Sequence, residues 1–278
     1  MPELAPFGAR LAAAIQAQGH LCVGIDPHAS LMDAWGLNDD VEGLRRFSAV
    51  ALEAAVGVAA AIKPQVALYE RHGSAGLAAL EELLAASREV GMLTIADAKR
   101  GDIGSTMAGY AQAWLGESSP LRADSVTLSP YLGVGALGPA LELADQTGRG
   151  VFVLGLTSNP EGQRVQHAGG ADSAAGRVVA DVAAWNLEHG CDPLGSLGLV
   201  VGATVGDDAA ALGLDLAAGA PPLLTPGYGA QGATSADLRR YFAHVWDQLI
   251  VPASRSLLRA GPDGMRDAVE AARDDLGA

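Results

Sequence analysis

The chain has 278 residues, of which 49% are hydrophobic and 18% are charged, so it can bury a large core. Its 32 acidic residues outnumber the 18 basic ones, and the formal net charge of −14 argues against nucleic acid or an anionic membrane surface as a partner. No apolar run approaches the length of about 18 residues that a transmembrane helix needs, and the N-terminus lacks signal-peptide features. We therefore expect a soluble, cytoplasmic protein that holds any anionic ligand with a local cluster of positive charge.

Short apolar runs with strand character alternate with Ala- and Leu-rich helical stretches along the whole chain. The predicted strands are residues 21–25, 61–66, 92–96, 125–128, 151–156, 197–201, 223–225 and 248–251. The predicted helices cover residues 41–60, 75–90, 106–115, 135–146, 173–189, 205–213, 235–241 and 263–275. Strands that are nearly continuous apolar runs, separated by helices, are typical of a parallel sheet covered on both faces. The pattern predicts an α/β fold, a (β/α)8 TIM barrel forming a single domain over residues 1–278, with a doubly wound sheet as the alternative.

Three local features carry no predicted chemistry. Residues 161–173 (EGQRVQHAGGADS) are polar and Gly-rich, and predict a long surface loop inserted into the barrel. Cys22 lies in an apolar run and Cys191 in a loop, so two free thiols are the better interpretation, with one disulfide as the alternative. The six histidines are scattered without the paired spacing of a zinc site, and no metal is expected.

The ends of the predicted strands are the place to look for an active site, because catalytic residues of such barrels project from the C-terminal ends of the strands. Polar or loop-forming residues lie at or just beyond these ends: Asp26, Lys63, Asp97, Lys99, Ser129, Thr157, Ser158, Asn159, Thr204, Pro226, Gly227, Ser254 and Arg255. Their gathering at one end of the barrel predicts a functional face there.

Lysine is rare in this chain. Of the 18 basic residues, 16 are Arg and only Lys63 and Lys99 are Lys, and both lie at the ends of apolar runs. An ammonium group can release a proton near neutral pH when its surroundings shift its pKa, whereas a guanidinium group cannot. The two lysines are therefore candidates for chemistry that Arg could not perform.

The segment DAKRGD, residues 97–102, concentrates charge at the end of the third predicted strand. In an extended segment Asp97 and Lys99 point to the same face, and Lys63 on the neighbouring strand could join them, while Arg100 points elsewhere. Opposite charges so placed hold one another ionised. The alternative is a structural ion-pair network. Burial of charge is costly and apolar residues would often serve as well, so the pattern favours a functional site that includes Asp102.

A glycine-rich segment, residues 224–232, follows the seventh predicted strand, and Arg255 follows the eighth. Such backbone can direct successive N–H groups at an anion, and the loops after strands 7 and 8 are the usual phosphate site of these barrels. An ordinary turn would explain the glycines alone. Arg255, which could add a bidentate contact, favours phosphate binding.

A second glycine motif, Gly133, Gly135 and Gly138, matches GxGxxG between a strand and a helix. A dinucleotide site would also place an acid about 20 residues further on, at the end of the next strand. Residues 154–158 contain no acid. We interpret these glycines as a strand-to-helix loop rather than an NAD site.

Taken together, these features resemble the orotidine 5′-phosphate decarboxylase family, most closely its longer bacterial branch. The motifs that carry the resemblance occur in order along most of the chain: GIDPH (24–28), AAIKPQ (60–65), DAKRGDI (97–103), LTSNPEG (156–162), TPGYGAQG (225–232) and PASRSLL (252–258). The DxKxxD element alone also occurs in related barrel decarboxylases, whereas the complete set is specific.

The resemblance implies a homodimeric barrel that converts orotidine 5′-monophosphate to UMP and CO2 in pyrimidine biosynthesis without a metal or organic cofactor. It implies a charged tetrad of Lys63, Asp97, Lys99 and Asp102, with Asp102 reaching into the site of the partner subunit. Lys99 would stabilise the carbanion left at C6 and protonate it. The substrate-binding residues that it implies are Asp26 (ribose), Ser158 (pyrimidine), Pro226, Gly227, Gln231 and Arg255 (phosphate), and Ile103 and Thr106, which would cross with Asp102.

Two other functions remain open at this point. A Mg²⁺-dependent sugar-phosphate decarboxylase of the same superfamily would use the DxKxxD cluster, but would be expected to carry an acid rather than Lys63 on the second strand. A non-enzymatic phosphate-binding barrel would keep the glycine-rich loop and need no Lys/Asp tetrad.

Overall fold

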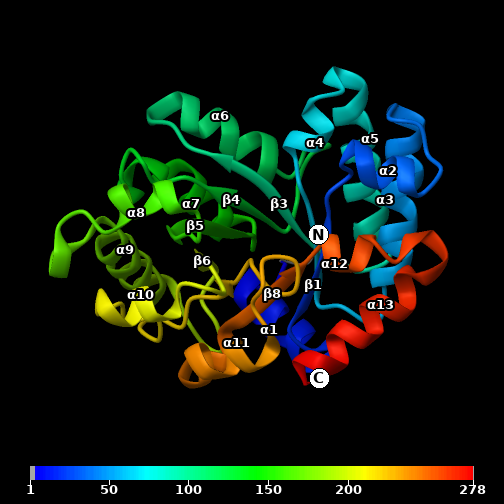
Figure 1. Cartoon of the computed structure of the whole chain (residues 1–278). Helices are drawn as coiled ribbons and strands as arrows, with labels where there is room; N and C mark the ends of the chain where they lie inside the picture. Colours follow the sequence, from blue (N-terminus) through cyan, green and yellow to red (C-terminus); the bar gives the residue numbers. More distant parts are fainter. Residues whose placement is uncertain (1–3, 278) are drawn as a thin grey trace.

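The computed structural model describes residues 4–277, and in this part of the chain eight parallel strands close into a barrel in sequence order (Figure 1). The strands are β1 Leu21–Ile25, β2 Ala61–Pro64, β3 Leu93–Arg100, β4 Ser125–Leu128, β5 Gly150–Leu156, β6 Leu197–Val201, β7 Leu223–Leu224 and β8 Leu249–Ala253. Pairing of β8 with β1 closes the barrel. The TIM-barrel prediction is confirmed, and the open doubly wound sheet is excluded.

Helices surround the strands, and each of the eight predicted helical stretches overlaps an observed helix (Figure 1). The α-helices are α1 Phe7–Gln18, α2 Ala29–Ala34, α3 Val41–Ala55, α4 Ala67–Glu70, α5 Gly73–Glu89, α6 Gly104–Leu115, α7 Gly138–Gln146, α8 Pro160–Gln166, α9 Ala174–His189, α10 Gly206–Ala211, α11 Ser235–Phe242, α12 Arg255–Leu258 and α13 Gly261–Leu276. Three 3₁₀ segments complete them: η1 Val134–Leu137, η2 Gly170–Asp172 and η3 Ala243–Gln248. Among residues 4–277, no helix is long and apolar enough to cross a membrane.

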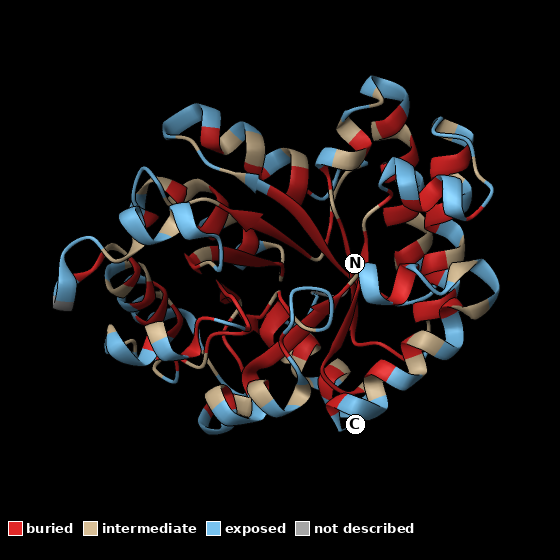
Figure 2. Ribbon diagram, in the orientation of Figure 1, coloured by how far each residue is buried: buried red, intermediate tan, exposed pale blue. Residues whose placement is uncertain are grey.

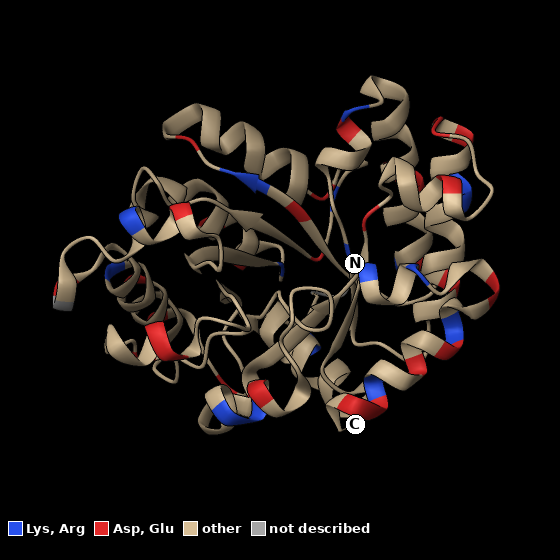
Figure 3. Ribbon diagram, viewed as in Figure 1, with Lys and Arg blue, Asp and Glu red and all other residues tan. Residues whose placement is uncertain are grey.

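The strands are buried on both faces, and the outer faces of the helices are exposed (Figure 2). Most charged residues lie on the helices and loops around the barrel (Figure 3). Successive strand residues alternate between the barrel interior and the layer between strands and helices, so Cys22 and Leu21 belong to different core clusters. Because Cys22 is fully buried, its pKa rises to about 12, and in the described residues it and Cys191 are unpaired.

Helix α1 packs against the residues that face the barrel interior. Its Phe7 is fully buried and meets Phe152 of β5 edge to face, with ring centroids 5.9 Å apart. Gly150 makes this packing possible, because a Cβ at that position would lie 2.2 Å from the Phe7 ring. No helix is predicted for residues 7–18 from the sequence, yet their apolar side chains form part of the interior core.

The prediction of a long surface loop over residues 161–173 is wrong in part, because a helix covers its first half. The exposed segment contains α8 and the short segment η2, with the rest irregular. Pro160 stands at the first position of α8, where its fixed φ suits a helix start and its missing N–H costs nothing. Gln166 at the end of α8 accepts a hydrogen bond from the backbone N–H of Thr157 and donates one to the Thr157 hydroxyl. The helix thus returns to the end of β5.

The candidate active site

The two lysines and Asp97 meet at the C-terminal end of neighbouring strands β2 and β3. Lys63 Nζ lies 2.7 Å from Asp97 Oδ2, and Lys99 Nζ contacts Asp97 Oδ1. Lys63 and Asp97 are each 7% exposed, whereas the side chain of Lys99 is about half exposed. One carboxylate therefore separates a buried ammonium group from one that faces the open end of the barrel.

The backbone that brings Asp97 and Lys99 together is not the regular strand that the spacing predicted. Lys99 has φ +48°, in the left-handed region, and the pairing of β3 with β4 shifts register between Ala96 and Arg100. Such a conformation costs a non-glycine residue about 1–3 kcal/mol and is concentrated at functional sites. The predicted meeting of the two side chains is observed, but a local break in the strand produces it.

Two residues that were not predicted as site residues donate hydrogen bonds to Asp97. The hydroxyl of Thr127 on β4 donates to Asp97 Oδ1 at 3.0 Å and accepts from the Lys99 backbone N–H at 3.0 Å. Gln65 Nε2 donates to Asp97 Oδ2 at 3.2 Å. The position of Gln65 two residues after Lys63 was the available sequence signal. For Thr127 there was only a hydroxyl within an apolar strand.

The electrostatics of the group favour its ionised form. Burial alone would raise the pKa of Asp97, but the charges of Lys63 and Lys99 outweigh it and hold this pKa well below the usual range. Burial likewise opposes the charge on Lys63, but the carboxylates of Asp97 and Asp26 raise its pKa above the ordinary value. At neutral pH the Lys63–Asp97 pair is therefore fully charged.

Asp26 follows β1 on the other side of Lys63. Its Oδ2 accepts a hydrogen bond of 2.6 Å from the Ser254 hydroxyl, at the end of β8. Its Oδ1 is buried and has no hydrogen-bond partner among the described residues. A buried carboxylate oxygen of this kind is a suitable acceptor for a ligand hydroxyl.

The glycine-rich loop follows β7 and lies across the mouth of the barrel from Asp97. Gly227 has φ +131°, and a Cβ there would lie 3.2 Å from the Ala203 side chain, so the turn requires glycine. Gln231 in the same loop accepts a 3.3 Å hydrogen bond from the Ser158 hydroxyl, which joins the loops after β5 and β7. Arg255 begins α12 with an exposed side chain.

A cavity of about 600 Å³ connects these groups. Eight of the twelve predicted site residues line it: Asp26, Lys63, Asp97, Lys99, Pro226, Gly227, Gln231 and Arg255. Thr127 and Gln65 also line it, and apolar side chains such as Leu154, Val200 and Leu224 form part of its wall. The cavity thus has an ionic end around Asp97 and a glycine-rich, cationic end around Arg255.

The other four predicted residues, Asp102, Ile103, Thr106 and Ser158, do not line this cavity. Asp102 accepts a 2.8 Å hydrogen bond from the Ile103 backbone N–H, and within residues 4–277 it forms no ion pair with either lysine. Ile103 is 61% exposed and Thr106 is exposed at the start of α6. A single chain therefore brings together three members of the predicted tetrad. Of the glycines in the GxGxxG match, Gly133 precedes η1, Gly135 lies within it and Gly138 begins α7, so the motif connects β4 to α7 as predicted.

A barrel that gathers its buried charges at the C-terminal ends of the strands has the active-site arrangement of TIM-barrel enzymes. Residues 19–272 match the model of the orotidine 5′-phosphate decarboxylase / HUMPS family, and the chain belongs to this family. It is 53% identical to the orotidine 5′-phosphate decarboxylase of Streptomyces coelicolor over 261 residues, 93% of this chain and 91% of the relative. It is 54% identical to that of Salinispora arenicola over 260 residues, 92% of this chain and 91% of the relative.

Solved structures agree with this assignment. A crystal structure from Streptomyces avermitilis, provisionally called an orotidine 5′-phosphate decarboxylase, has a TM-score of 0.92 at 51% identity and covers 99% of this chain and 95% of its own. The structure of Leishmania donovani OMP decarboxylase has a TM-score of 0.74 at 30% identity, covering 96% of this chain and 95% of its own. The family resemblance inferred from the motifs is confirmed.

Proposed function

We propose that this chain, acting as one catalytic domain, decarboxylates orotidine 5′-monophosphate to UMP and CO2 in pyrimidine biosynthesis. The observation that carries the proposal is the Lys63–Asp97–Lys99 group at one end of a cavity whose other end is the glycine-rich loop with Arg255. A nucleoside monophosphate has its reacting base and its phosphate at opposite ends, which matches this division. Family membership supports the same reaction.

Lys99 is the proton donor in this proposal. Loss of CO2 leaves a carbanion at C6 of the pyrimidine, and a fixed cation beside it lowers the energy of the transition state. Both lysines line the cavity and contact Asp97, but the side chain of Lys99 is about half exposed whereas that of Lys63 is 9% exposed. Lys63 therefore orients Asp97, and Lys99 stabilises the developing charge and transfers a proton to C6.

The phosphate is held far from the reacting carbon. The guanidinium group of Arg255 binds the phosphate through two hydrogen bonds. The loop at Pro226, Gly227 and Gln231 adds hydrogen bonds from backbone N–H groups and from the Gln231 amide. Such remote binding energy can position the base for reaction. Asp26 accepts from ribose hydroxyls through its unpartnered Oδ1, and Ser158, bonded to Gln231, reaches the pyrimidine.

We further propose that the active form is a homodimer in which Asp102 enters the partner's site. The support is that Asp102 lies apart from the other three charges of its own chain, next to an exposed apolar group. Ile103, Tyr131 and Leu132 are 61%, 82% and 55% exposed. Such a group of exposed large apolar residues is characteristic of an interface. Burial against a second copy would carry Ile103 and Thr106 across together with Asp102.

Mixing two inactive variants tests the shared site. In a twofold dimer of Lys99→Ala with Asp102→Asn subunits, one site contains both substitutions and the other contains neither. Random exchange of subunits should then restore about a quarter of the wild-type activity per site. If the mixture stays inactive although sedimentation shows mixed dimers, Asp102 does not act across the interface.

The reaction itself is tested with purified protein and orotidine 5′-monophosphate, with and without a metal chelator. We expect loss of the orotate absorbance at the same rate in both conditions. No loss of absorbance would contradict the proposed reaction. Inhibition by chelator that added Mg²⁺ reverses would instead favour the metal-dependent sugar-phosphate decarboxylase.

A further inference from the structure

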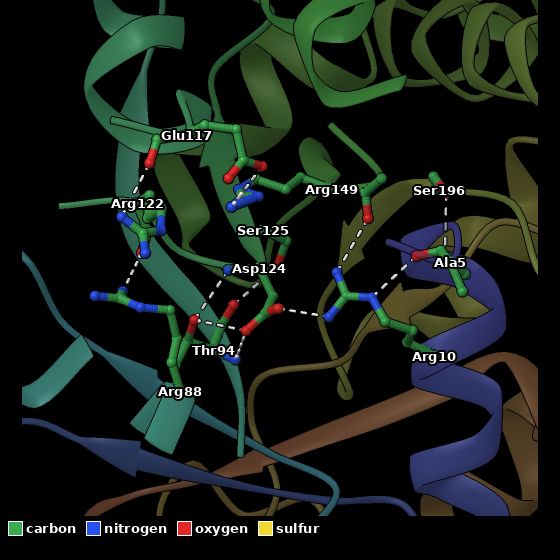
Figure 4. Close-up of polar contacts among 12 residues, drawn as sticks. Ala5, Arg10, Arg88, Thr94, Glu117, Arg122, Asp124, Ser125, Arg149 and Ser196 are labelled. Carbon is green, nitrogen blue, oxygen red and sulfur yellow. Dashed lines mark hydrogen bonds and ion pairs between the residues drawn. The ribbon is translucent and has the colours of Figure 1, made fainter. Parts of the chain in front are cut away.

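A second cavity lies at the opposite end of the barrel, where strands β3, β4 and β5 begin, and has a volume of about 920 Å³. Four arginines line it: Arg10, Arg88, Arg122 and Arg149. Figure 4 shows these side chains, which come from α1, α5 and the segments before β4 and β5, around Asp124 and Glu117. The proposed reaction uses none of these residues.

The cavity carries excess positive charge in a chain of net charge −14. Three carboxylates line it, of which Asp145 is exposed at its rim. Asp124 accepts from Arg10 Nη1 at 2.5 Å, and from the Thr94 backbone N–H and hydroxyl at 2.9 and 3.0 Å. Three of its roughly four acceptor positions are therefore occupied. Among residues 4–277 the cavity lining thus has four guanidinium groups and three carboxylates, an excess of one positive charge.

Arg149 has buried hydrogen-bond donors that lack a partner among residues 4–277. It is 6% exposed, and its Nη2 lies 3.2 Å from Oε1 of the half-exposed Glu117. Its Nε and Nη1 are buried and have no hydrogen-bond partner among residues 4–277. Buried donors without partners are rare in proteins and call for a ligand or an ordered solvent molecule. Burial lowers the pKa of Arg149, although the charges of Glu117 and Asp124 oppose this shift.

Arg88 and Arg122 form no ion pair within residues 4–277. Arg88 Nη1 donates to the Arg122 carbonyl at 2.8 Å, and Arg122 Nη1 donates to the Glu117 carbonyl at 2.9 Å. Carbonyl groups are neutral, so these hydrogen bonds offset neither charge. Burial and the charge of Arg122 lower the pKa of Arg88, although Asp124 acts in the opposite direction.

We propose that this cavity is a second anion site, which binds a phosphomonoester through Arg149, Arg88 and Arg122. Phosphate oxygens accept paired hydrogen bonds from guanidinium groups, and a bound phosphate group would offset the excess positive charge. The volume exceeds what a bare phosphate ion fills and leaves room for a sugar-sized ester group. The site is separate from the active site and does not depend on the reaction proposed above.

Phosphate binding at the active site must be removed before the second site can be measured. The background is therefore the full-length Arg255→Ala protein, titrated by calorimetry with inorganic phosphate and with ribose 5-phosphate at constant ionic strength. The test variant adds Arg149→Met, which keeps the side-chain volume and removes the charge. The matched control adds Arg46→Gln, which removes an exposed charge on α3.

We expect binding in the Arg255→Ala background that weakens about 10- to 100-fold with Arg149→Met and is unchanged with Arg46→Gln. Tighter binding of ribose 5-phosphate would identify an ester as the ligand, and equal affinity would identify free phosphate; either result supports the site. Because Arg149→Met could destabilise the fold, Arg88→Met provides a second test with the same expected loss. Binding that survives both substitutions, or no binding in the background protein, would overturn the proposal.

Discussion

The hydroxyl of Thr127 is the group whose removal tests the geometry of the site most directly. Thr127→Val keeps the shape of the side chain and removes one hydrogen bond to the Asp97 carboxylate and one from the Lys99 backbone. The first is a bond to a charged group, contributing about 1.5–3 kcal/mol, and loss of the second leaves an N–H unsatisfied at a cost of about 1–3 kcal/mol. The left-handed backbone conformation of Lys99 then loses a hydrogen bond that stabilises it.

The loss should appear in turnover rather than in substrate binding. If displacement of the Lys99 ammonium group raises the activation free energy by about 1.4–2.8 kcal/mol, kcat falls about 10- to 100-fold. KM should change little, because the proposed phosphate and ribose contacts lie elsewhere in the cavity. Steady-state kinetics with orotidine 5′-monophosphate measure both constants, and urea unfolding measures the accompanying loss of stability.

Thr127→Ser is the matched control, because it keeps the hydroxyl and loses a methyl group. We expect its kcat to stay much closer to wild type than that of Thr127→Val. Two results would refute the reasoning: a Thr127→Val enzyme with unchanged kcat, or equal losses in both variants. Equal losses would mean that packing of the methyl group, and not the hydroxyl, positions Lys99.

Three further changes follow from the same structure. Lys99→Ala should abolish turnover in the orotate absorbance assay while leaving UMP affinity largely intact by calorimetry; near-normal turnover would remove Lys99 as proton donor. Asp97 has a lower pKa folded than unfolded, so its stabilisation is present above about pH 4 and is lost as pH falls. Urea unfolding of Asp97→Asn should therefore show a shallower loss of stability below that pH than wild type, and an equal slope would argue against the low pKa. Gly150→Ala should destabilise by about 1–3 kcal/mol in thermal unfolding, because its Cβ would strike the Phe7 ring, and an unchanged Tm would contradict the packing described.

The barrel could be predicted because each strand is a short apolar run and a helical pattern follows it. The strands 21–25, 125–128 and 197–201 were predicted with the bounds that the structure gives. Helix α1 was missed because its apolar residues do not form the outer layer of a strand–helix unit. They pack into the barrel interior, and only the fold reveals that such a position exists.

The site could be predicted as far as charge and spacing define it. Lys63, Asp97 and Lys99 stood out because lysine is rare and because charge at the end of an apolar run needs a reason. Thr127 could not be found in this way, since its alignment with Asp97 depends on the register shift of β3 against β4. That shift includes a lysine with positive φ, for which the sequence carries no glycine or asparagine signal.

The structure also separates charges that the segment DAKRGD places side by side. Arg100 pairs with Glu70, and its carbonyl accepts a 2.7 Å hydrogen bond from the Ser129 N–H. A Cβ at Gly101 would lie 2.5 Å from the Ser129 carbonyl oxygen, so only glycine fits where the chain passes this strand end. Held at Arg100 and Gly101, the backbone directs Asp102 away from Asp97. Asp97 and Lys99 thus line the cavity of their own chain, whereas Asp102, three residues after Lys99, lies outside it at the surface that we propose meets a second copy.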